Sequence, residues 1–419
     1  MSYCETKEKK HLEYNDLLEE FILGCKQDEK IGFEYERIPI VKKTKEIASY
    51  YGIDGVCEAL REYARNENWD YILDNNEIIG LKKLHNIITL EPGSQIELSV
   101  EPQSNIHDLK KKIEEIDSTL IPTLNKFGIE LINKGCSPTT TYKNIKLIPK
   151  QRYHIMANYL WGILSDVMMR ETAGIQVGID YKNEEDAMQK FRVANLMQPF
   201  TTAMFANSKI RGKVDTGYKS FRALAWLNTD NERCGFATDF SSRMAFKDYV
   251  ETLLDTPMIF INRKNTTLSV NGRVTFRQFM DKGFEGFDAN IEDWKLHSNL
   301  FFPEVRLRSF IEIRNQDCVG NGLEYSIPAL YKGIMYDKNS LEEVEKMLLQ
   351  YSFNELNELR YNVPKYAIHS KLRGKCITNI CKEILEISYS TLKTQGNDEE
   401  KFLEPIIELI NKNKTPADI

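Results

Sequence analysis

Charged and apolar side chains alternate through the segment PEVRLRSFIEIR, which begins at Pro303. Val, Leu and Ile occupy most of the odd positions, whereas carboxylate or guanidinium groups occupy most of the even ones. A period of two predicts a single β-strand with one apolar face and one charged face. Such a charged face could bind metal ions and phosphate groups. Its members are Glu304, Arg306, Arg308, Glu312 and Arg314.

Two other predicted strands also carry carboxylates. GFEYERI contains Glu34 and Glu36, and ITLEPGSQIELS places Glu91 and Glu97 around a Pro-Gly turn. If these glutamates met Glu312 in one cleft, each close pair would repel by roughly 4 kcal/mol at an effective dielectric near 20. Mg²⁺ would relieve that repulsion, because it prefers oxygen ligands and bridges carboxylates to nucleotide phosphates. The alternative is that each strand exposes polar residues to water, as antiparallel sheets often do.

The elements that must position these residues follow from hydrophobic periodicity and turn signals. Strands are predicted over 32–40, 87–91, 95–100, 171–180, 257–263 and 304–314. Helices are predicted over 12–25, 45–65, 105–127, 150–168, 184–207 and 275–280, and a helical outer layer over 340–412. Residues 133–144 and 212–239 are predicted to be irregular. The pattern predicts an α+β fold in which helices cover a mixed, mostly antiparallel central sheet, within one catalytic domain over 1–419.

Composition excludes several classes of protein. The net charge of −6 in 419 residues is spread without a basic stripe, which argues against a nucleic-acid partner. No apolar stretch is long enough to cross a membrane, and the first ten residues are polar, so we expect a cytoplasmic protein without a membrane partner. The eight cysteines are scattered without a Cys-x-x-Cys pair, which predicts reduced thiols.

Several catalytic motifs are absent from the sequence. There is no Gly-rich loop ending in Gly-Lys-Ser/Thr, no G-x-G-x-x-G, no H-E-x-x-H and no G-x-S-x-G. The six histidines are isolated, and His154 and His297 are more simply interpreted as structural than as substrate-orienting residues. Any bound phosphate would therefore have to be held by metal ions and arginines.

Eight segments between Ile31 and Tyr336 resemble, in order, the blocks of the plant and proteobacterial type of glutamate-cysteine ligase. They are IGFEYERI, ITLEPGSQIELS, IPKQRYHIM, IQVGIDY, KFRVANLMQPFTTAMFANS, SFRALAWLNTDNERCG, FSSRMAFKDYV and FFPEVRLRSFIEIR. The resemblance is much weaker beyond Lys338. It implies a glutamine-synthetase-like antiparallel sheet that lines an active-site funnel, with the core motifs at 31–336 and a helical C-terminal cover at 340–412.

The resemblance implies an ATP-dependent carboxylate-amine ligase of glutathione biosynthesis. ATP would phosphorylate the γ-carboxylate of L-glutamate, and the amine of L-cysteine would then attack the acyl phosphate. The products would be γ-glutamylcysteine, ADP and phosphate. Because ATP brings about four negative charges to five carboxylates, two or three Mg²⁺ ions and several arginines would be needed.

The resemblance also implies roles for individual residues. The metal ligands would be Glu34, Glu36, Glu91, Glu97 and Glu312. Arg306 and Arg314 would be catalytic, and the nucleotide would bind to Gln176, Lys264 and Arg314. The substrate-binding residues would be Arg152, Tyr153, Gly178, Arg222, Trp226 and Arg233.

Two departures from the family pattern leave alternatives open. Gly178 stands where the family usually has an asparagine, and Tyr35 stands where it has a histidine. The loss of an amide from the funnel opens space, so a ligase that joins glutamate or a related acid to another amine is the alternative. A catalytically silent nucleotide-binding regulator is a third hypothesis, against which the retained glutamates argue, because buried carboxylates without a counter-ion destabilise a fold. The sequence does not predict the oligomeric state.

Overall fold

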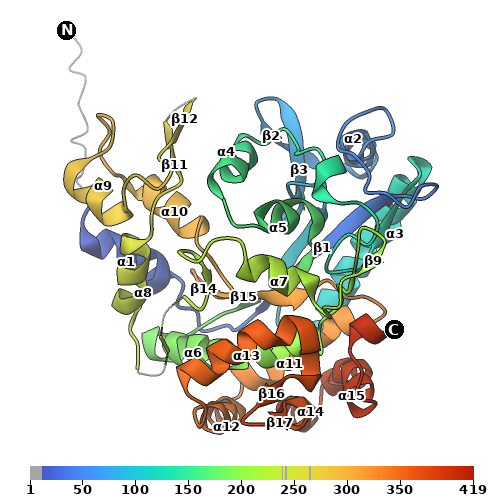
Figure 1. The fold of residues 1–419 in the computed structure, drawn as a ribbon, viewed down its shortest axis with the longest axis vertical. Helices are drawn as coiled ribbons and strands as arrows, with labels where there is room; N and C mark the ends of the chain where they lie inside the picture. Colours follow the sequence, from blue (N-terminus) through green and yellow to red (C-terminus); the bar gives the residue numbers. More distant parts are fainter. Residues whose placement is uncertain (1–11, 238, 241–242, 264–265) are drawn as a thin grey trace.

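The fold is built on a nine-stranded sheet in which neighbouring strands run antiparallel (Figure 1). The computed structural model describes residues 12–237, 239–240, 243–263 and 266–419. The strand order is β14-β15-β7-β1-β5-β4-β3-β2, and β6 pairs with β1 beside this path. The strands of this sheet are β1 (Ile31–Val41), β2 (Asp70–Asp74), β3 (Glu77–Lys83), β4 (Asn86–Leu90), β5 (Ile96–Gln103), β6 (Ile129–Ile132), β7 (Gly174–Ile179), β14 (Val305–Leu307) and β15 (Ile311–Asp317).

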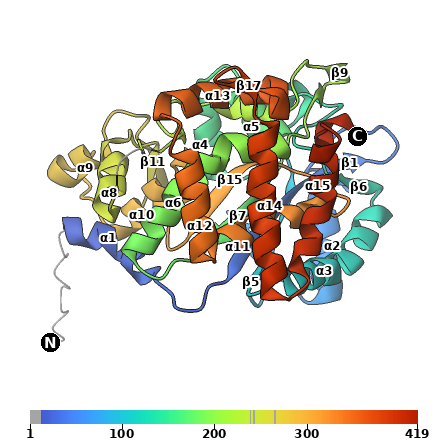
Figure 2. The same cartoon turned by 90° about the horizontal axis from the view of Figure 1, so that it is seen from below.

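Helices cover the apolar face of this sheet. In the views of Figures 1 and 2, α6, α11, α12, α13, α14 and α15 form a layer beneath it, and helix α3 packs on β5 and β6. Phe33 and Tyr35 of β1 point into this core, and Ile175 and Val177 of β7 are fully buried there. The helices of this face are α2 (Val56–Glu67), α3 (Ile106–Lys126), α6 (Glu184–Met204), α11 (Leu323–Met335), α12 (Lys338–Leu348), α13 (Phe353–Tyr366), α14 (Thr378–Gln395) and α15 (Glu404–Asn411).

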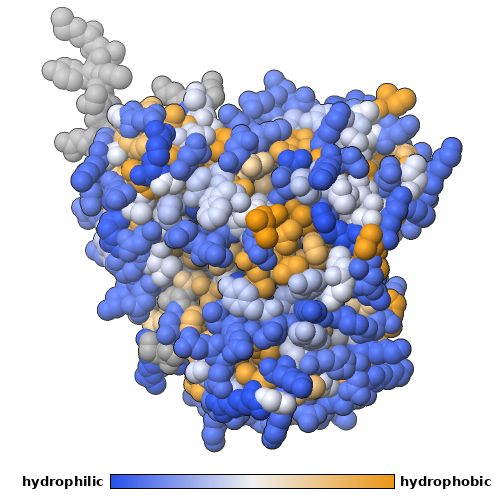
Figure 3. All heavy atoms as spheres, viewed as in Figure 1, coloured by the Kyte–Doolittle hydropathy of each residue, from blue (hydrophilic) through white to orange (hydrophobic). Residues whose placement is uncertain are grey.

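The opposite, polar face of the sheet is covered by shorter elements. Figure 3 shows the face of the molecule that is seen in Figure 1. Hydrophobic side chains gather near the centre of this face, where α4, α5 and α7 lie in Figure 1. These helices enclose the cavity described below. The elements outside the main sheet and its helical layer are α1 (Tyr14–Leu23), α4 (Gln151–Tyr159), α5 (Ser165–Glu171), α7 (Phe221–Leu227), α8 (Phe246–Asp255), α9 (Phe276–Lys282), α10 (Ile291–Asn299) and the short strands β8 (Ile210–Arg211), β9 (Val214–Asp215), β10 (Cys234–Gly235), β11 (Phe260–Arg263), β12 (Thr266–Ser269), β13 (Phe302–Pro303), β16 (Lys371–Leu372) and β17 (Lys375–Cys376).

The predicted α+β fold with a mostly antiparallel central sheet is confirmed. Strand β1, the hairpin β4–β5 and helices α3 and α6 lie within a few residues of their predicted positions. Helix α3 begins after Asn105, whose side chain caps the helix by accepting a hydrogen bond from the Asp108 backbone N–H. In the described part of the chain, no helix has the length and apolar character that a membrane crossing requires.

Four predicted elements were wrong in detail. The helix predicted over 45–65 begins only at Val56, because Lys45 and Gly52 adopt positive φ in the preceding turns. The single helix predicted over 150–168 is divided into α4 and α5 around Gly162, whose hydrogen faces the backbone oxygens of Asn228 and Thr229. The segment 212–239 contains helix α7. The strand predicted over 304–314 is the hairpin β14–β15, and hairpin β2–β3 was not predicted.

Candidate active site

The five predicted glutamates converge on one cavity of about 1120 Å³ above the polar face of the sheet. Five arginines line the same cavity, so its walls carry equal numbers of carboxylates and guanidinium groups. The glutamates are Glu34, Glu36, Glu91, Glu97 and Glu312, and the arginines are Arg152, Arg222, Arg306, Arg308 and Arg314. Their convergence contradicts the alternative that each strand separately exposes polar side chains to water.

The sheet register brings the carboxylates together. Glu36 of β1 lies directly opposite Glu97 of β5, and Glu34 lies opposite Gln176 of β7. Glu91 follows β4 at the Pro-Gly turn, where its backbone N–H donates to the carbonyl of Gln95. Like charges directly opposite each other destabilise an antiparallel pair. This arrangement therefore needs a compensating positive charge.

The charged segment that begins at Glu304 turns back on itself. Arg306 of β14 lies opposite Glu312 of β15, and the turn between them occupies Arg308 to Phe310. Glu304 does not line the cavity, because its carboxylate accepts a hydrogen bond from Arg360 of α13 at 2.7 Å. The sequence pattern was thus correct for four of its five charged residues and wrong about the continuous strand.

Glu312 is surrounded by arginines. The Arg306 Nε donates to its Oε2 at 2.6 Å, the Arg314 Nη1 lies at 3.3 Å, and the Arg308 Nη1 lies 3.8 Å from its Oε1. Burial raises the pKa of Glu312, but the charges of Arg306 and Arg314 outweigh burial and hold the pKa at about 2. Glu312 is therefore ionised at any working pH.

The other carboxylates have no such neutralisation. Among the described residues, the ion pairs of the cavity include Glu312 but none of the other four glutamates. Burial and the charge of Glu312 raise the pKa of Glu34 to about 7. Burial and the charges of Glu34, Glu91 and Glu36 raise the pKa of Glu97 well above its usual value. Burial also raises the pKa of Glu36, against the opposing charge of Arg222.

This donor set fits hard divalent cations. All the candidate ligands are oxygens, and the unpaired carboxylates supply the negative charge that such an ion would neutralise. Within the described residues, no three His, Cys, Asp or Glu side chains lie close enough together to hold one ion by themselves. Mg²⁺ usually retains several waters and is bound through one or two carboxylates and substrate phosphates, so this spacing suits it.

Gln176 links the carboxylates to the arginine cluster. Its Nε2 donates to the Glu36 Oε1 at 2.9 Å and lies 3.4 Å from the Glu97 Oε2. Its Oε1 accepts a hydrogen bond from the Arg314 Nη1 at 2.7 Å. The amide therefore fixes the relative positions of groups on three strands.

Arg152 and Tyr153 of α4 lie at one end of the cavity. The Tyr153 hydroxyl donates to the Glu91 Oε1 at 3.2 Å, and the Arg152 guanidinium lies 5.1 Å from the centre of the Tyr153 ring. Lys150, which sequence reasoning missed, donates to the Tyr153 hydroxyl at 3.2 Å. Burial and the charge of Arg152 lower the pKa of Lys150 to about 8. The sequence did offer a signal for Lys150, because it lies three residues before Tyr153 in the same family-like segment, IPKQRYHIM.

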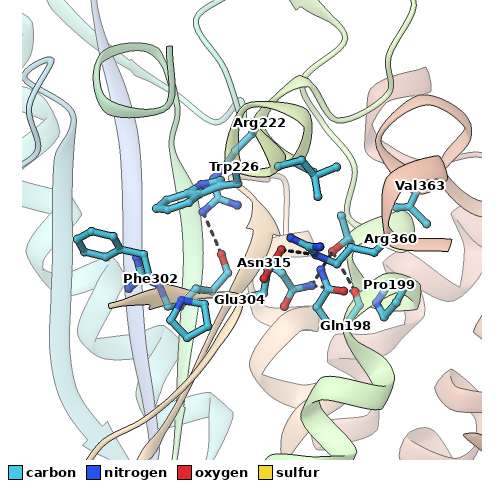
Figure 4. Close-up of a pocket in the computed structure, with 14 residues that line it drawn as sticks. Gln198, Pro199, Arg222, Trp226, Phe302, Glu304, Asn315, Arg360 and Val363 are labelled. Carbon is cyan, nitrogen blue, oxygen red and sulfur yellow. Dashed lines mark hydrogen bonds and ion pairs between the residues drawn. The ribbon is translucent and has the colours of Figure 1, made fainter. Parts of the chain in front are cut away.

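Arg222 and Trp226 of α7 form another wall of the cavity. The Arg222 Nη2 donates to the carbonyl of Arg314 at 3.0 Å, in space left open by the missing side chain of Gly174. A second pocket of about 440 Å³ lies behind this wall. Figure 4 shows it between Trp226 and Phe302 on one side and Arg360 and Val363 on the other.

Among the described residues, two predicted site residues do not line the main cavity. Arg233 is fully buried elsewhere, where it pairs with Asp230 at 2.7 Å and donates to the carbonyl of Pro257, so a substrate-binding role is not supported. Gly178 shares the face of Gln176, as predicted, but lines an adjoining cavity of about 520 Å³. Lys264 lies outside the described residues.

Gln95 positions the turn that carries Glu91, a role that the sequence did not predict. Its buried amide accepts a hydrogen bond from the Gly93 backbone N–H at 2.8 Å and donates to the carbonyl of Thr172 at 2.8 Å. This bond holds the turn between Glu91 and Glu97 against the end of α5.

Comparisons with known proteins agree with the geometry. The family model described as glutamate-cysteine ligase family 2 matches residues 30–419. The chloroplastic glutamate–cysteine ligase of Solanum lycopersicum is 32% identical over 411 residues, which cover 96% of this chain and 78% of that protein. The chloroplastic glutamate–cysteine ligase B of Oryza sativa subsp. japonica is also 32% identical, over 96% of this chain and 82% of that protein.

Two solved structures share the fold. A glutamate–cysteine ligase from Francisella tularensis in complex with AMP superposes with a TM-score of 0.58 at 11% identity, over 94% of this chain and 84% of that one. A bifunctional glutathione synthetase from Pasteurella multocida superposes with a TM-score of 0.53 at 12% identity, over 97% of this chain and 51% of that one. At these identities the superpositions support the fold alone.

Proposed function

The chain belongs to glutamate-cysteine ligase family 2, and we propose that it joins L-glutamate to L-cysteine through a γ-glutamyl phosphate, with ATP as phosphoryl donor. The observation that carries this proposal is the convergence of five glutamates and five arginines on one cavity. A ligase that brings ATP and glutamate together must hold several negative charges side by side. Positioning and charge neutralisation are the main contributions a protein makes to phosphoryl transfer.

The first chemical step transfers the terminal phosphoryl group. A γ-carboxylate oxygen of glutamate attacks the γ-phosphorus of ATP, the bond to the bridging oxygen breaks, and ADP leaves. Arg314 and Arg306 are placed to hold the charge that develops, because both converge on Glu312 at the edge of the cavity. Divalent cations held by Glu34, Glu36, Glu91 and Glu97 would supply further neutralisation of the phosphate oxygens.

The second step forms the amide. The amine nitrogen of cysteine, after loss of a proton, attacks the acyl carbon, and phosphate leaves with the electrons of the broken C–O bond. No enzyme nucleophile is needed for either step. Burial raises the pKa values of both Cys234 and Cys318, so neither thiol is ionised at neutral pH.

We propose that nucleotide and amino acids occupy different ends of the site. The cavity of about 520 Å³ beside Gly178 is lined by Gly32, Gly178, Pro102 and Phe310 together with charged residues, and its glycines and aromatic ring suit a nucleotide base. The opposite end carries Arg152 and Tyr153, which suit the charged groups of an amino acid. Glutamate would then receive the phosphoryl group between the two ends.

The second candidate is a ligase that uses another acceptor amine. This candidate rested on the family departures at Tyr35 and Gly178, and the position of Tyr35 removes the first of them. Tyr35 is buried on the helical side of the sheet, where its hydroxyl donates to the carbonyl of Val319 at 2.9 Å. The replacement of histidine at this position therefore does not alter the cavity. The replacement at Gly178 remains, but it affects the cavity assigned to the nucleotide.

The whole chain is proposed to act as one catalytic unit, because Arg360 of the C-terminal cover contacts Glu304 behind the active-site wall. A cytoplasmic location stays a prediction, and the relatives named above are described as chloroplastic.

A panel of amines tests the proposed function. Phosphate release is measured with ATP, Mg²⁺ and glutamate in the presence of cysteine, of other amino acids and of no amine. We expect fast release only with cysteine, together with γ-glutamylcysteine in the product mixture. Faster release with another amine would support the second candidate, and production of AMP and pyrophosphate would contradict both.

A further inference from the structure

The turn between β14 and β15 lies at the junction of the two adjoining cavities. Arg308, at its start, lines the large polar cavity, and Phe310, at its end, lines the smaller cavity. The two cavities share three lining residues: Glu34, Gln176 and Glu312. A ligand that occupies both cavities must therefore pass this turn.

Of the three arginines around Glu312, Arg308 makes the fewest polar contacts with other described residues. The Arg306 guanidinium also donates to the carbonyls of Asn299 and Phe301, and the Arg314 guanidinium also donates to Gln176. Arg308 makes only a 3.8 Å ion pair with Glu312 and stacks on the Phe310 ring at 5.4 Å, and its buried Nε lacks a hydrogen-bond partner among the described residues.

The backbone of the turn is fixed in place. The Tyr181 hydroxyl donates to the carbonyl of Arg308 at 2.7 Å, and the Arg308 backbone N–H donates to the carbonyl of Phe310 at 2.8 Å. On the outside, Gly24 approaches Ser309 so closely that an added Cβ would lie 2.6 Å from its Cα. The side chain of Arg308 is thus presented by a rigid support but remains free to contact a ligand.

The smaller cavity has room for a flat group beside Phe310. Gly32 and Gly178 face each other across β1 and β7, and a Cβ on Gly178 would lie 3.2 Å from the Phe310 ring. The missing side chains leave the ring in contact with the sheet surface. The remaining lining residues are Lys26, Lys30, Phe33, Ser99, Val100, Pro102 and Asp180.

We infer that the turn Arg308–Phe310 is a nucleotide-binding strap, in which Arg308 contacts the polyphosphate and Phe310 packs against the base. This inference rests on the proposed function, since it assumes that ATP is the phosphoryl donor. A guanidinium group forms charge-assisted hydrogen bonds with phosphate oxygens, and aromatic rings stack on bases of any type. One turn therefore serves both chemical parts of the same ligand.

Four variants and three probes separate the two contacts. Binding of Mg-ATP, adenosine and Mg-tripolyphosphate to the full-length protein is measured by calorimetry without glutamate. Arg308→Met should weaken Mg-ATP and tripolyphosphate at least tenfold and leave adenosine unchanged, and Arg308→Lys should restore part of the loss. Phe310→Ala should weaken Mg-ATP and adenosine at least tenfold and leave tripolyphosphate unchanged. Arg373→Met, which removes an exposed arginine paired with Glu355, is the matched control.

The outcomes distinguish this inference from the proposed function. If the wild-type protein does not bind Mg-ATP, the proposed function fails. If it binds Mg-ATP and both turn variants bind all three probes normally, the strap is wrong while the function stands. A rise in the KM for glutamate with unchanged nucleotide affinity would also overturn the strap, because it would place Arg308 against the amino acid. Circular dichroism of each variant confirms that the fold is retained.

Discussion

At the scale of single residues, the carboxylates of the site fall into two electrostatic groups. Glu312 is held by three arginines, whereas Glu97 lies opposite Glu36 on the neighbouring strand and, among the described residues, has only Thr89 and Gln176 as hydrogen-bond donors. Removing a charge from each group should therefore change stability in opposite directions.

Glu97→Gln should leave the metal-free protein as stable as the wild type or more stable, because it relieves repulsion from Glu34, Glu91 and Glu36. Glu312→Gln should destabilise it by about 3–5 kcal/mol, because buried arginines lose their counter-ion. Both variants should lose turnover by at least a hundredfold. Urea denaturation in EDTA measures the stabilities, and equal effects of the two substitutions would contradict the charge assignment.

The pH dependence of stability provides a second prediction. The pKa of Glu34 is about 7 in the folded protein and near 4.5 when unfolded, so the folded state binds more protons between these values. Stability of the metal-free protein should therefore fall as pH rises from about 4.5 to about 7. Glu34→Gln should reduce this dependence without abolishing it, because the pKa values of Glu36 and Glu97 are also raised, and Mg²⁺ should restore more stability at pH 7.5 than at pH 5. If the stability of Glu34→Gln depended on pH as the wild type does, Glu34 would not be a cause of this dependence.

The cysteines should be dispensable for the chemistry. Cys318 is completely buried near Tyr35, and Cys234 lies outside the main cavity. The double variant Cys234→Ser, Cys318→Ser should keep kcat within a few-fold of the wild type, with a small loss of stability from the buried hydroxyl. Complete inactivation of a folded double variant would show that a thiol takes part in the reaction.

At the scale of elements, local signals predicted what they directly control. The Pro-Gly pair gave the turn between β4 and β5, and the alternation in β1 placed Glu34 and Glu36 on one face. The turn at Arg308–Phe310 escaped prediction because it contains neither glycine nor proline and leaves the alternation of types nearly intact. Strand ends without turn residues are fixed by tertiary packing, here against Gly24 and Tyr181.

Long-range pairing was the other part that sequence could not supply. Nothing in the separate segments predicts that Glu36 lies opposite Glu97, or that Gln176 bridges them to Arg314. For the same reason Arg233 looked like a ligand-binding arginine, although its partner Asp230 lies only three residues away. An arginine that binds substrate and one that holds a loop have the same sequence signal.

The element-scale prediction concerns Gly178 on β7. An added side chain would press on Phe310 and on the Cα of Gly32, at 3.2 and 3.4 Å from the new Cβ. Gly178→Asn should therefore raise the KM for ATP by about tenfold, within the range of small pocket changes, and leave the preference among amines unchanged. Steady-state kinetics with cysteine and two larger amines measures both. An altered amine preference with a normal KM for ATP would instead support acceptor selection at this position.

At the scale of the whole molecule, the C-terminal helical cover reaches the back of the active site. Arg360 of α13 donates to Glu304 at 2.7 Å, and the backbone carbonyl of Glu304 accepts a hydrogen bond from the Arg314 N–H at 2.8 Å. The cover therefore supports the strand that presents the arginine cluster. This connection lies outside the segments through which the family resemblance is strongest.

Arg360→Met should lower both stability and turnover, because the half-buried Glu304 loses its partner beside Arg314. Arg360→Lys should restore part of each, since it keeps the charge but not the fixed geometry of the guanidinium. Thermal denaturation and kcat are measured together on the three proteins. Normal turnover in a destabilised Arg360→Met protein would limit the role of the cover to folding.

The central claim, that the site transfers a phosphoryl group to the side-chain carboxylate of glutamate, is tested most directly by oxygen labelling. The protein is incubated with ATP, Mg²⁺, cysteine and glutamate labelled with ¹⁸O in its γ-carboxylate, and the phosphate released is analysed by mass spectrometry. We predict that one ¹⁸O atom per turnover appears in inorganic phosphate and that ADP accumulates in equal amount. Unlabelled phosphate, or label recovered in AMP, would contradict the account.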